Sequence, residues 1–131
     1  MDFDLITIKG ISILGINRWP EYFDIYFDFI PHLGKGVIEQ YKGKVDILVT
    51  HWPPYGILDK VFKRERGGSK GVLKFVKEIK PKIHIFGHIH EGYGYTEIDG
   101  IKFYNVSYLD RQYKTKNKPF LISFPISETE K

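Results

Sequence analysis

The chain has 131 residues, of which 42% are hydrophobic and 27% are charged, and its formal net charge is +4. These values exclude a disordered chain and leave room for one packed core, so we expect a single domain over residues 1–131. The chain has no cysteine, no apolar run of roughly 18 residues and an acidic start unlike a secretory signal, which favours a cytoplasmic protein without membrane contact.

The first part of the chain is rich in strand-forming residues. Alanine is absent, whereas isoleucine and aromatic residues are abundant. Residues 5–8 and 11–16 predict two strands joined by a tight turn at Lys9 and Gly10. Residues 19–33 are aromatic and irregular, and their pattern leaves both a helical turn and a loop open.

The middle of the chain alternates strand and helix patterns. Residues 36–41 predict a short helix that ends at Gly43, and the apolar run 45–50 predicts a strand buried on both faces. Residues 71–80 place apolar side chains at helical spacing before Pro81, and residues 82–86 predict a further strand. This order predicts a mixed sheet with at least one crossover helix.

The last part of the chain predicts a hairpin. Residues 95–98 and 101–106 flank Asp99-Gly100, which is a strong turn signal. Residues 120–124 predict a final strand before a polar tail at 126–131. The fold class that we expect is therefore α/β (or α+β), with a C-terminal hairpin.

Positive charge is concentrated in residues 59–82, which carry +6 while the rest of the chain carries −2. Such a patch suits an anionic partner, either a phosphate-bearing ligand or a nucleic acid, but a solvated helix face with its loop gives the same pattern. The nine basic residues are Lys60, Lys63, Arg64, Arg66, Lys70, Lys74, Lys77, Lys80 and Lys82.

Three of the five histidines follow predicted strands. His51 follows the run 45–50 and precedes two prolines, whereas His88 and His90 follow the run 82–86. The carboxyl ends of neighbouring parallel strands meet at one edge of a sheet, so we expect these three imidazoles at a shared rim. Neutral imidazole suits Zn, Fe, Mn and Ni, and the sequence therefore predicts a metal site there.

The other two histidines are expected to have no role in that site. His84 alternates with two isoleucines, which predicts a position inside the sheet with a bond to a neighbouring group. His32 follows a proline in the aromatic segment and is expected at the surface.

The segments around the three histidines resemble a known family. Residues 46–59 read Asp-Ile-Leu-Val-Thr-His-Trp-Pro-Pro-Tyr-Gly-Ile-Leu-Asp, and residues 87–94 read Gly-His-Ile-His-Glu-Gly-Tyr-Gly. These resemble the last two signature motifs of the calcineurin-like metallophosphoesterases, especially the branch named for fetal-brain metallophosphoesterase-domain proteins. The resemblance extends from Leu5 to Ser107, where Asn105-Val106-Ser107 matches the segment after the closing hairpin.

This resemblance implies a fold and a chemistry. Family members pack two sheets face to face with helices outside, and two divalent cations clamp a phosphate while a metal-bridging hydroxide attacks phosphorus. By position, His51 and His88 match ligands of the second metal, and His90 matches a ligand of the first. The implied cofactor is a divalent metal (Mn, Fe, Zn or Ni), and the implied ligand is a nucleotide or another phosphodiester.

The family's first three motifs have no counterpart in these residues. Asp-x-His, Gly-Asp-x-x-Asp and Gly-Asn-His followed by Asp or Glu, which supply the other metal ligands and the leaving-group acid, do not occur. The chain thus resembles the C-terminal half alone, and no catalytic residue is assigned. Two close cations without a bridging carboxylate repel one another strongly, so we expect metal binding to be weak or absent in the isolated chain.

Three functions follow as alternatives. The first is a phosphoesterase that is active only with a complementing N-terminal half, with Lys60, Lys63 and Arg64 beside the phosphate. The second is an inactive binding or regulatory module of the same ancestry, and the third is nucleic-acid binding through residues 59–82. Because a missing half would uncover apolar surface, we also expect a homodimer or higher oligomer, or a complex with a separate N-terminal-half polypeptide.

Overall fold

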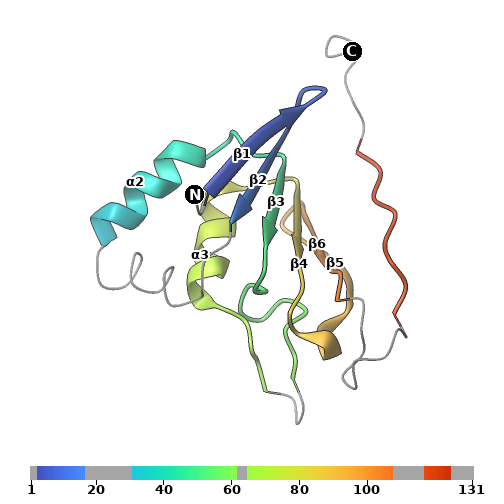
Figure 1. Cartoon of the computed structure of the whole chain (residues 1–131). Coiled ribbons are helices and arrows are strands. Elements are labelled where there is room, and N and C mark those ends of the chain that lie inside the picture. Colours follow the sequence, from blue (N-terminus) through green and yellow to red (C-terminus); the bar gives the residue numbers. More distant parts are fainter. Residues whose placement is uncertain (1–2, 17–30, 62–64, 108–116, 125–131) are drawn as a thin grey trace.

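Six strands form one mixed sheet in the computed structural model, which describes residues 3–16, 31–61, 65–107 and 117–124 (Figure 1). The order of the strands across the sheet is β1-β2-β3-β4-β6-β5. Most of the aromatic segment 19–33 and the polar tail at 126–131 lie outside the described residues. The strands are β1 (Phe3–Ile8), β2 (Ile11–Ile16), β3 (Ile47–Thr50), β4 (Ile83–Phe86), β5 (Gly94–Ile98) and β6 (Ile101–Asn105).

Both predicted tight turns are confirmed. Lys9 and Gly10 have φ values of 51° and 82° between the antiparallel strands β1 and β2. Asp99 and Gly100 have φ values of 53° and 81° between β5 and β6. Two successive positive φ values match the twist of the flanking strands, which is why short hairpins prefer these residue types.

The centre of the sheet is parallel. Strand β2 pairs with β3, β3 with β4, and β4 with β6, all in the parallel direction. The helix α3 (Lys70–Ile79) connects β3 to β4, which confirms the predicted crossover helix. The carboxyl ends of β3 and β4 consequently lie side by side.

Local signals set the limits of both helices. The Ser69 side chain accepts a hydrogen bond of 3.1 Å from the Val72 amide at the start of α3, and Lys80 is left-handed at its end. The helix α2 (Pro31–Tyr41) begins five residues before the expected start. Proline is favoured at the first position of a helix because its missing N–H has no partner there, which explains the earlier start.

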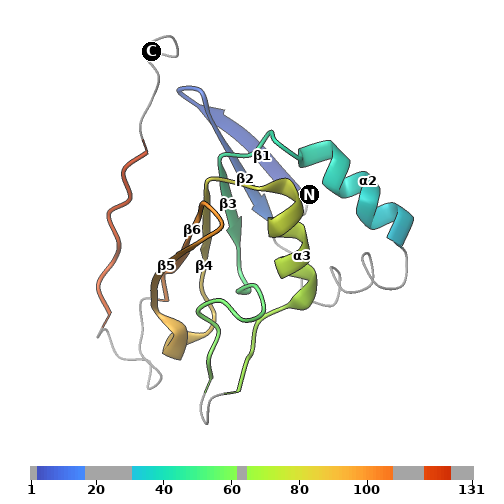
Figure 2. The same ribbon diagram turned by 180° about the vertical axis from the view of Figure 1, so that it is seen from behind.

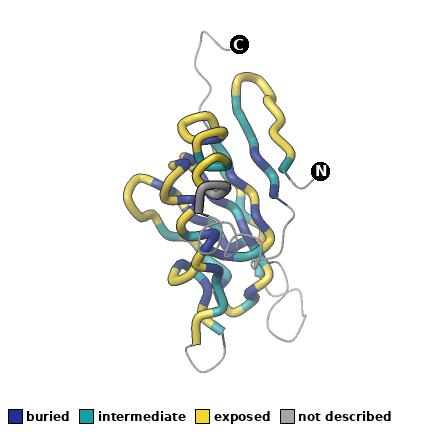
Figure 3. Tube along the Cα trace, turned by 90° about the vertical axis from the view of Figure 1, so that its left-hand side faces the viewer, coloured by how far each residue is buried: buried dark blue, intermediate teal, exposed yellow. Residues whose placement is uncertain are grey.

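The core lies between the helices and one face of the sheet (Figure 2). Leu14, Leu48 and Phe103 point to this face and are at most 2% exposed, as is Phe75 of α3. Strand β1 is exposed on both of its faces, since all of residues 4–10 are exposed (Figure 3). Val49, at the centre of β3, is 37% exposed, so the expectation that the run 45–50 is buried on both faces is wrong.

The expected strand at 120–124 does not form. Residues 118–124 have no regular secondary structure and run along the side of the sheet away from the helices (Figures 1 and 2). The Phe120 ring stacks on Tyr93 at 5.0 Å and meets Tyr104 at 5.4 Å, measured between ring centroids. Aromatic packing of Phe120 and a hydrogen bond from the Tyr93 hydroxyl to the Lys118 carbonyl, rather than ladder hydrogen bonds, therefore hold this segment.

No helix within the described ranges is both long enough and apolar enough to cross a membrane.

Candidate metal centre

Two of the three predicted ligands lie in contact at the expected edge of the sheet. His51 follows β3 directly, and His88 lies two residues beyond the end of β4. The His51 Nε2 atom is 3.1 Å from His88 Nδ1, and the Gly87 amide donates a hydrogen bond of 3.2 Å to the His51 carbonyl. The parallel pairing of the two strands thus brings together imidazoles that are 37 residues apart.

His90 stands near this pair but begins a separate element. It is the first residue of the short 3-10 helix η3 (His90–Gly92). Its charge is one cause of the lowered pKa of His88, so His90 lies within electrostatic range of that ring. In the described part of the chain, no three His, Asp or Glu side chains are grouped closely enough to hold one metal ion. The structure therefore joins His51 to His88 and leaves His90 beside them.

The surroundings of His88 favour its neutral form. Partial burial lowers the pKa of His88 below its ordinary value, and the charges of His51 and His90 lower it further. Part of that burial comes from Trp52, whose ring centroid is 3.8 Å from that of His88. An imidazole must be neutral to bind a metal, so this environment prepares His88 for such a role.

The nitrogens of His51 and His88 can serve as two ligands of one cation, although two ligands do not complete a metal site. Metal–nitrogen bonds are about 2.0–2.1 Å long, so two nitrogens 3.1 Å apart can both bond to one ion. Imidazole is a good ligand for the metals that the sequence predicts. The remaining ligands are not supplied by the described residues.

His84 is structural, which confirms the expectation from the sequence. It is 0% exposed, and its Nε2 is 2.9 Å from Thr50 Oγ1. Because the Thr50 hydroxyl donates its proton to the Trp52 carbonyl at 2.8 Å, His84 Nε2 must be the donor of their bond. Nδ1 has no hydrogen-bond partner among the described residues, and burial lowers the pKa of His84 to about 3. The ring is therefore neutral at ordinary pH.

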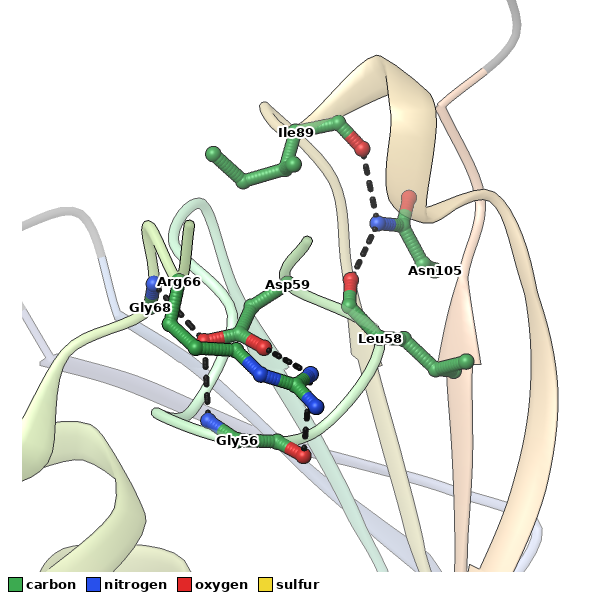
Figure 4. A network of polar contacts seen from close by, with 7 residues as sticks. All are labelled: Gly56, Leu58, Asp59, Arg66, Gly68, Ile89 and Asn105. Carbon is green, nitrogen blue, oxygen red and sulfur yellow. Dashed lines mark hydrogen bonds and ion pairs between the residues drawn. The ribbon is translucent and has the colours of Figure 1, made fainter. Parts of the chain in front are cut away.

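A buried carboxylate organises the loop that follows His51 (Figure 4). Asp59 is 0% exposed, and it accepts hydrogen bonds from the Gly56 amide at 2.8 Å and the Gly68 amide at 3.0 Å. Arg66 forms an ion pair with Asp59 at 2.8 Å. The sequence pattern counts Arg66 as part of a basic patch, whereas the fold uses it to neutralise a buried charge.

The predicted phosphate-binding residues are only partly described. Lys60 is exposed in the loop after β3, whereas Lys63 and Arg64 lie outside the described residues.

Other lysines of the basic segment lie elsewhere. Lys77, Lys80 and Lys82 line a cavity of about 470 Å³ between the end of α3 and the β5–β6 turn. Lys82 precedes β4 and His88 follows it, so this cavity lies at the other end of that strand. The segment 59–82 thus does not form one continuous surface beside the histidines.

Comparison with curated proteins finds relatives over nearly the whole chain. The human protein called metallophosphoesterase domain-containing protein 1 is 35% identical over 125 residues, which are 92% of this chain and 38% of that protein. A Caenorhabditis elegans protein, UPF0046 protein T07D4.2, is 32% identical over 130 residues, or 96% of this chain and 32% of its own length. The chain thus spans less than half the length of these relatives.

Structural comparison supports the fold alone. One solved crystal structure superposes with a TM-score of 0.57 at 17% identity, over 79% of this chain and 44% of that one. No family model matches the chain.

Proposed function

The chain belongs to the metallophosphoesterase family, and we propose that it forms the C-terminal half of a metal-dependent phosphodiesterase that acts once a first half completes its site. The observation that carries this proposal is the approach of His51 Nε2 to His88 Nδ1, at 3.1 Å, on the rim shared by β3 and β4. That arrangement supplies two imidazole nitrogens at the edge of the sheet where ligands of parallel sheets bind.

The residues of this chain would have distinct roles in the complete site. His51 and His88 would hold the second metal, and His90 would hold the first from its place at the start of η3. The bound cations would supply a hydroxide nucleophile near neutral pH and neutralise charge on the phosphate. Trp52 shields His88 from water, and Lys60, together with Lys63 and Arg64, would attract the substrate phosphate.

The first half would come from another polypeptide or from residues outside these 131. The relatives are more than twice as long as the segment that they share with this chain, which leaves room for such a half. The open face of the sheet offers a matching surface, because Ile6 is 51% exposed, Ile8 53% and Val49 37%. Apolar area of this kind is typical of a contact surface. A second copy of this chain would cover the face but would not supply the missing motifs.

Complementation tests the proposal directly. The chain is mixed with the first half of a relative in the presence of Mn²⁺ and bis(p-nitrophenyl) phosphate, and turnover is followed by absorbance. We expect turnover only from the mixture, and His88→Ala should lower kcat/KM by at least about 100-fold because it removes a metal ligand. Glu39→Ala, an exposed change on α2, is the matched control and should leave kcat/KM unchanged.

Other outcomes would overturn specific parts of the proposal. A folded complex without turnover would instead support the binding or regulatory module. Turnover by the pure chain, lost in His88→Ala, would show that the site needs no first half. Tight DNA or RNA binding with a steep salt dependence, and no turnover in the mixture, would support the nucleic-acid function.

A further inference from the structure

Asn105 connects the two loops that carry the histidines, and we propose that it is a positioning residue for the His51–His88 pair. This inference rests on the proposed function only in the statement that the pair binds a metal. The arrangement itself is a property of the chain.

The Asn105 side chain is fully enclosed, and each of its polar groups has a partner. Figure 4 shows the two partners of its Nδ2 atom, Leu58 and Ile89. It is 0% exposed at the end of β6, the strand next to β4. Its Nδ2 donates to the Leu58 carbonyl and to the Ile89 carbonyl, both at 2.9 Å. Its Oδ1 accepts a hydrogen bond of 3.1 Å from the Ser107 amide. One amide group thus bridges the loop after β3 and the loop after β4.

The hydrogen bond from Asn105 Nδ2 to the Ile89 carbonyl fixes the backbone between His88 and His90 in the loop after β4. The Ile89 carbonyl also accepts from the Gly92 amide at 3.1 Å and from Ser107 Oγ at 3.4 Å. His88 has a φ of 69°, a conformation that residues with a Cβ rarely adopt. A strained residue keeps such a conformation only where its neighbours are held firmly, and the fixed Ile89 peptide provides this.

The bond to Leu58 ties down the loop that starts at His51. The two loops approach closely here, because a Cβ added to Gly92 would stand 2.1 Å from the Leu58 carbonyl oxygen. The next residue, Asp59, is fixed by its own ion pair with Arg66. Asn105 therefore joins the η3 loop to a rigid part of the first loop, which sets the distance between the rings.

The test compares variants of the whole chain without metal. Asn105→Asp keeps the size and the acceptor of the side chain but loses both donors, and Asn105→Ala removes the group. Val72→Ala on α3, a core residue that is 1% exposed, is the control for general loss of stability. The readout is the imidazole ¹⁵N spectrum, which reports the hydrogen bond between His51 and His88 in chains shown to be folded.

We expect the His51–His88 hydrogen-bond signal to be lost in both Asn105 variants and kept in Val72→Ala. We also expect about tenfold weaker Ni²⁺ binding, by calorimetry, in the Asn105 variants, as for other groups that orient metal ligands. If neither Asn105 variant folds, Gly92→Ala separates the same two loops by a steric route and should lose the same signal. An unchanged imidazole spectrum in a folded Asn105 or Gly92 variant would overturn the inference.

The two proposals fail in different ways. A complemented wild-type chain without turnover would refute the proposed function and leave the metal-free imidazole result intact. A variant that keeps the ring contact would refute the positioning role, even if the complemented wild type hydrolyses its substrate.

Discussion

His84 and His88 differ in chemistry because they occupy different positions along one strand and its loop. His84 is enclosed on the helix side of β4, and burial lowers its pKa to about 3. His88 stands at the rim, where partial burial and two neighbouring imidazoles lower its pKa. Full enclosure makes the first imidazole a neutral structural group, whereas access at the rim leaves the second available to a ligand.

The depressed pKa of His84 predicts that stability falls in mild acid. Below pH 6.5 the unfolded chain binds a proton at this residue and the folded chain does not, so the free energy of unfolding decreases as the pH falls toward 3. The contribution of this residue is at most about 1.4 kcal/mol per pH unit. Urea unfolding between pH 7.5 and 4.5 measures the slope.

The matched variant for this prediction is His84→Gln, which keeps an amide donor for Thr50 but does not titrate. We expect a clearly shallower pH dependence in this variant. Equal slopes in the two proteins would contradict the assignment of the acid sensitivity to His84.

At the level of elements, close packing between the two loops leaves less space at η3 than at the exposed helix α2. Gly92 in η3 faces the Leu58 carbonyl with no space for a Cβ, whereas Gly36 in α2 has nothing within 4 Å of that position. Glycine at position 92 thus allows two loops to approach each other closely, whereas glycine at position 36 only weakens a helix.

The two glycines should therefore respond in opposite directions to alanine. Gly92→Ala should destabilise the chain by about 2 kcal/mol, because the backbone of one loop must move. Gly36→Ala should stabilise it by about 0.5–1 kcal/mol through helix propensity. Chemical denaturation measures both, and destabilisation of the same size in the two variants would contradict this account.

At the scale of the whole molecule, the two faces of the sheet are covered unequally. The helices cover the face that carries Leu14 and Leu48, whereas Ile6 and Ile8 point from β1 to the other face and are about half exposed. Strand β1 is also one of the two edge strands of the sheet, with β2 as its single neighbour among the described strands. An apolar face beside an open edge favours association.

We therefore expect the pure chain to self-associate at micromolar concentration when no first half is present. Ile6→Lys should weaken this association by at least about tenfold, because it places a charge on the open face. Thr7→Lys adds the same charge to the same strand but on the other face, and should have little effect. Light scattering measures both, and a monomeric wild-type chain would contradict the expectation.

The local features of this fold could be predicted because each depends on residues that are close in sequence. Lys9-Gly10 and Asp99-Gly100 specify their turns through backbone conformation alone. The apolar spacing in residues 71–80 predicts α3 with nearly the observed limits. The contact between His51 and His88 also followed from the sequence, because a crossover helix makes the two strands parallel and brings their ends together.

Other features required the tertiary structure, since they depend on partners far along the chain. Asn105 contacts Leu58 and Ile89, which are 47 and 16 residues away, and no local pattern identifies these bonds. The pairing of Arg66 with buried Asp59 likewise appears only when the loop is folded.

The sequence alone determined the order along the chain of the strands and helices from β1 to β6, the two hairpins and the edge of the sheet at which His51 and His88 meet. Backbone propensities and the period of apolar residues are short-range quantities, and they are sufficient for these features. Only the tertiary structure decided that one face of β3 is open, that residues 120–124 pack through an aromatic ring, and that Asn105 joins the two loops. Burial and hydrogen-bond partners depend on what else lies within a few ångströms in space, and the linear pattern does not contain that information.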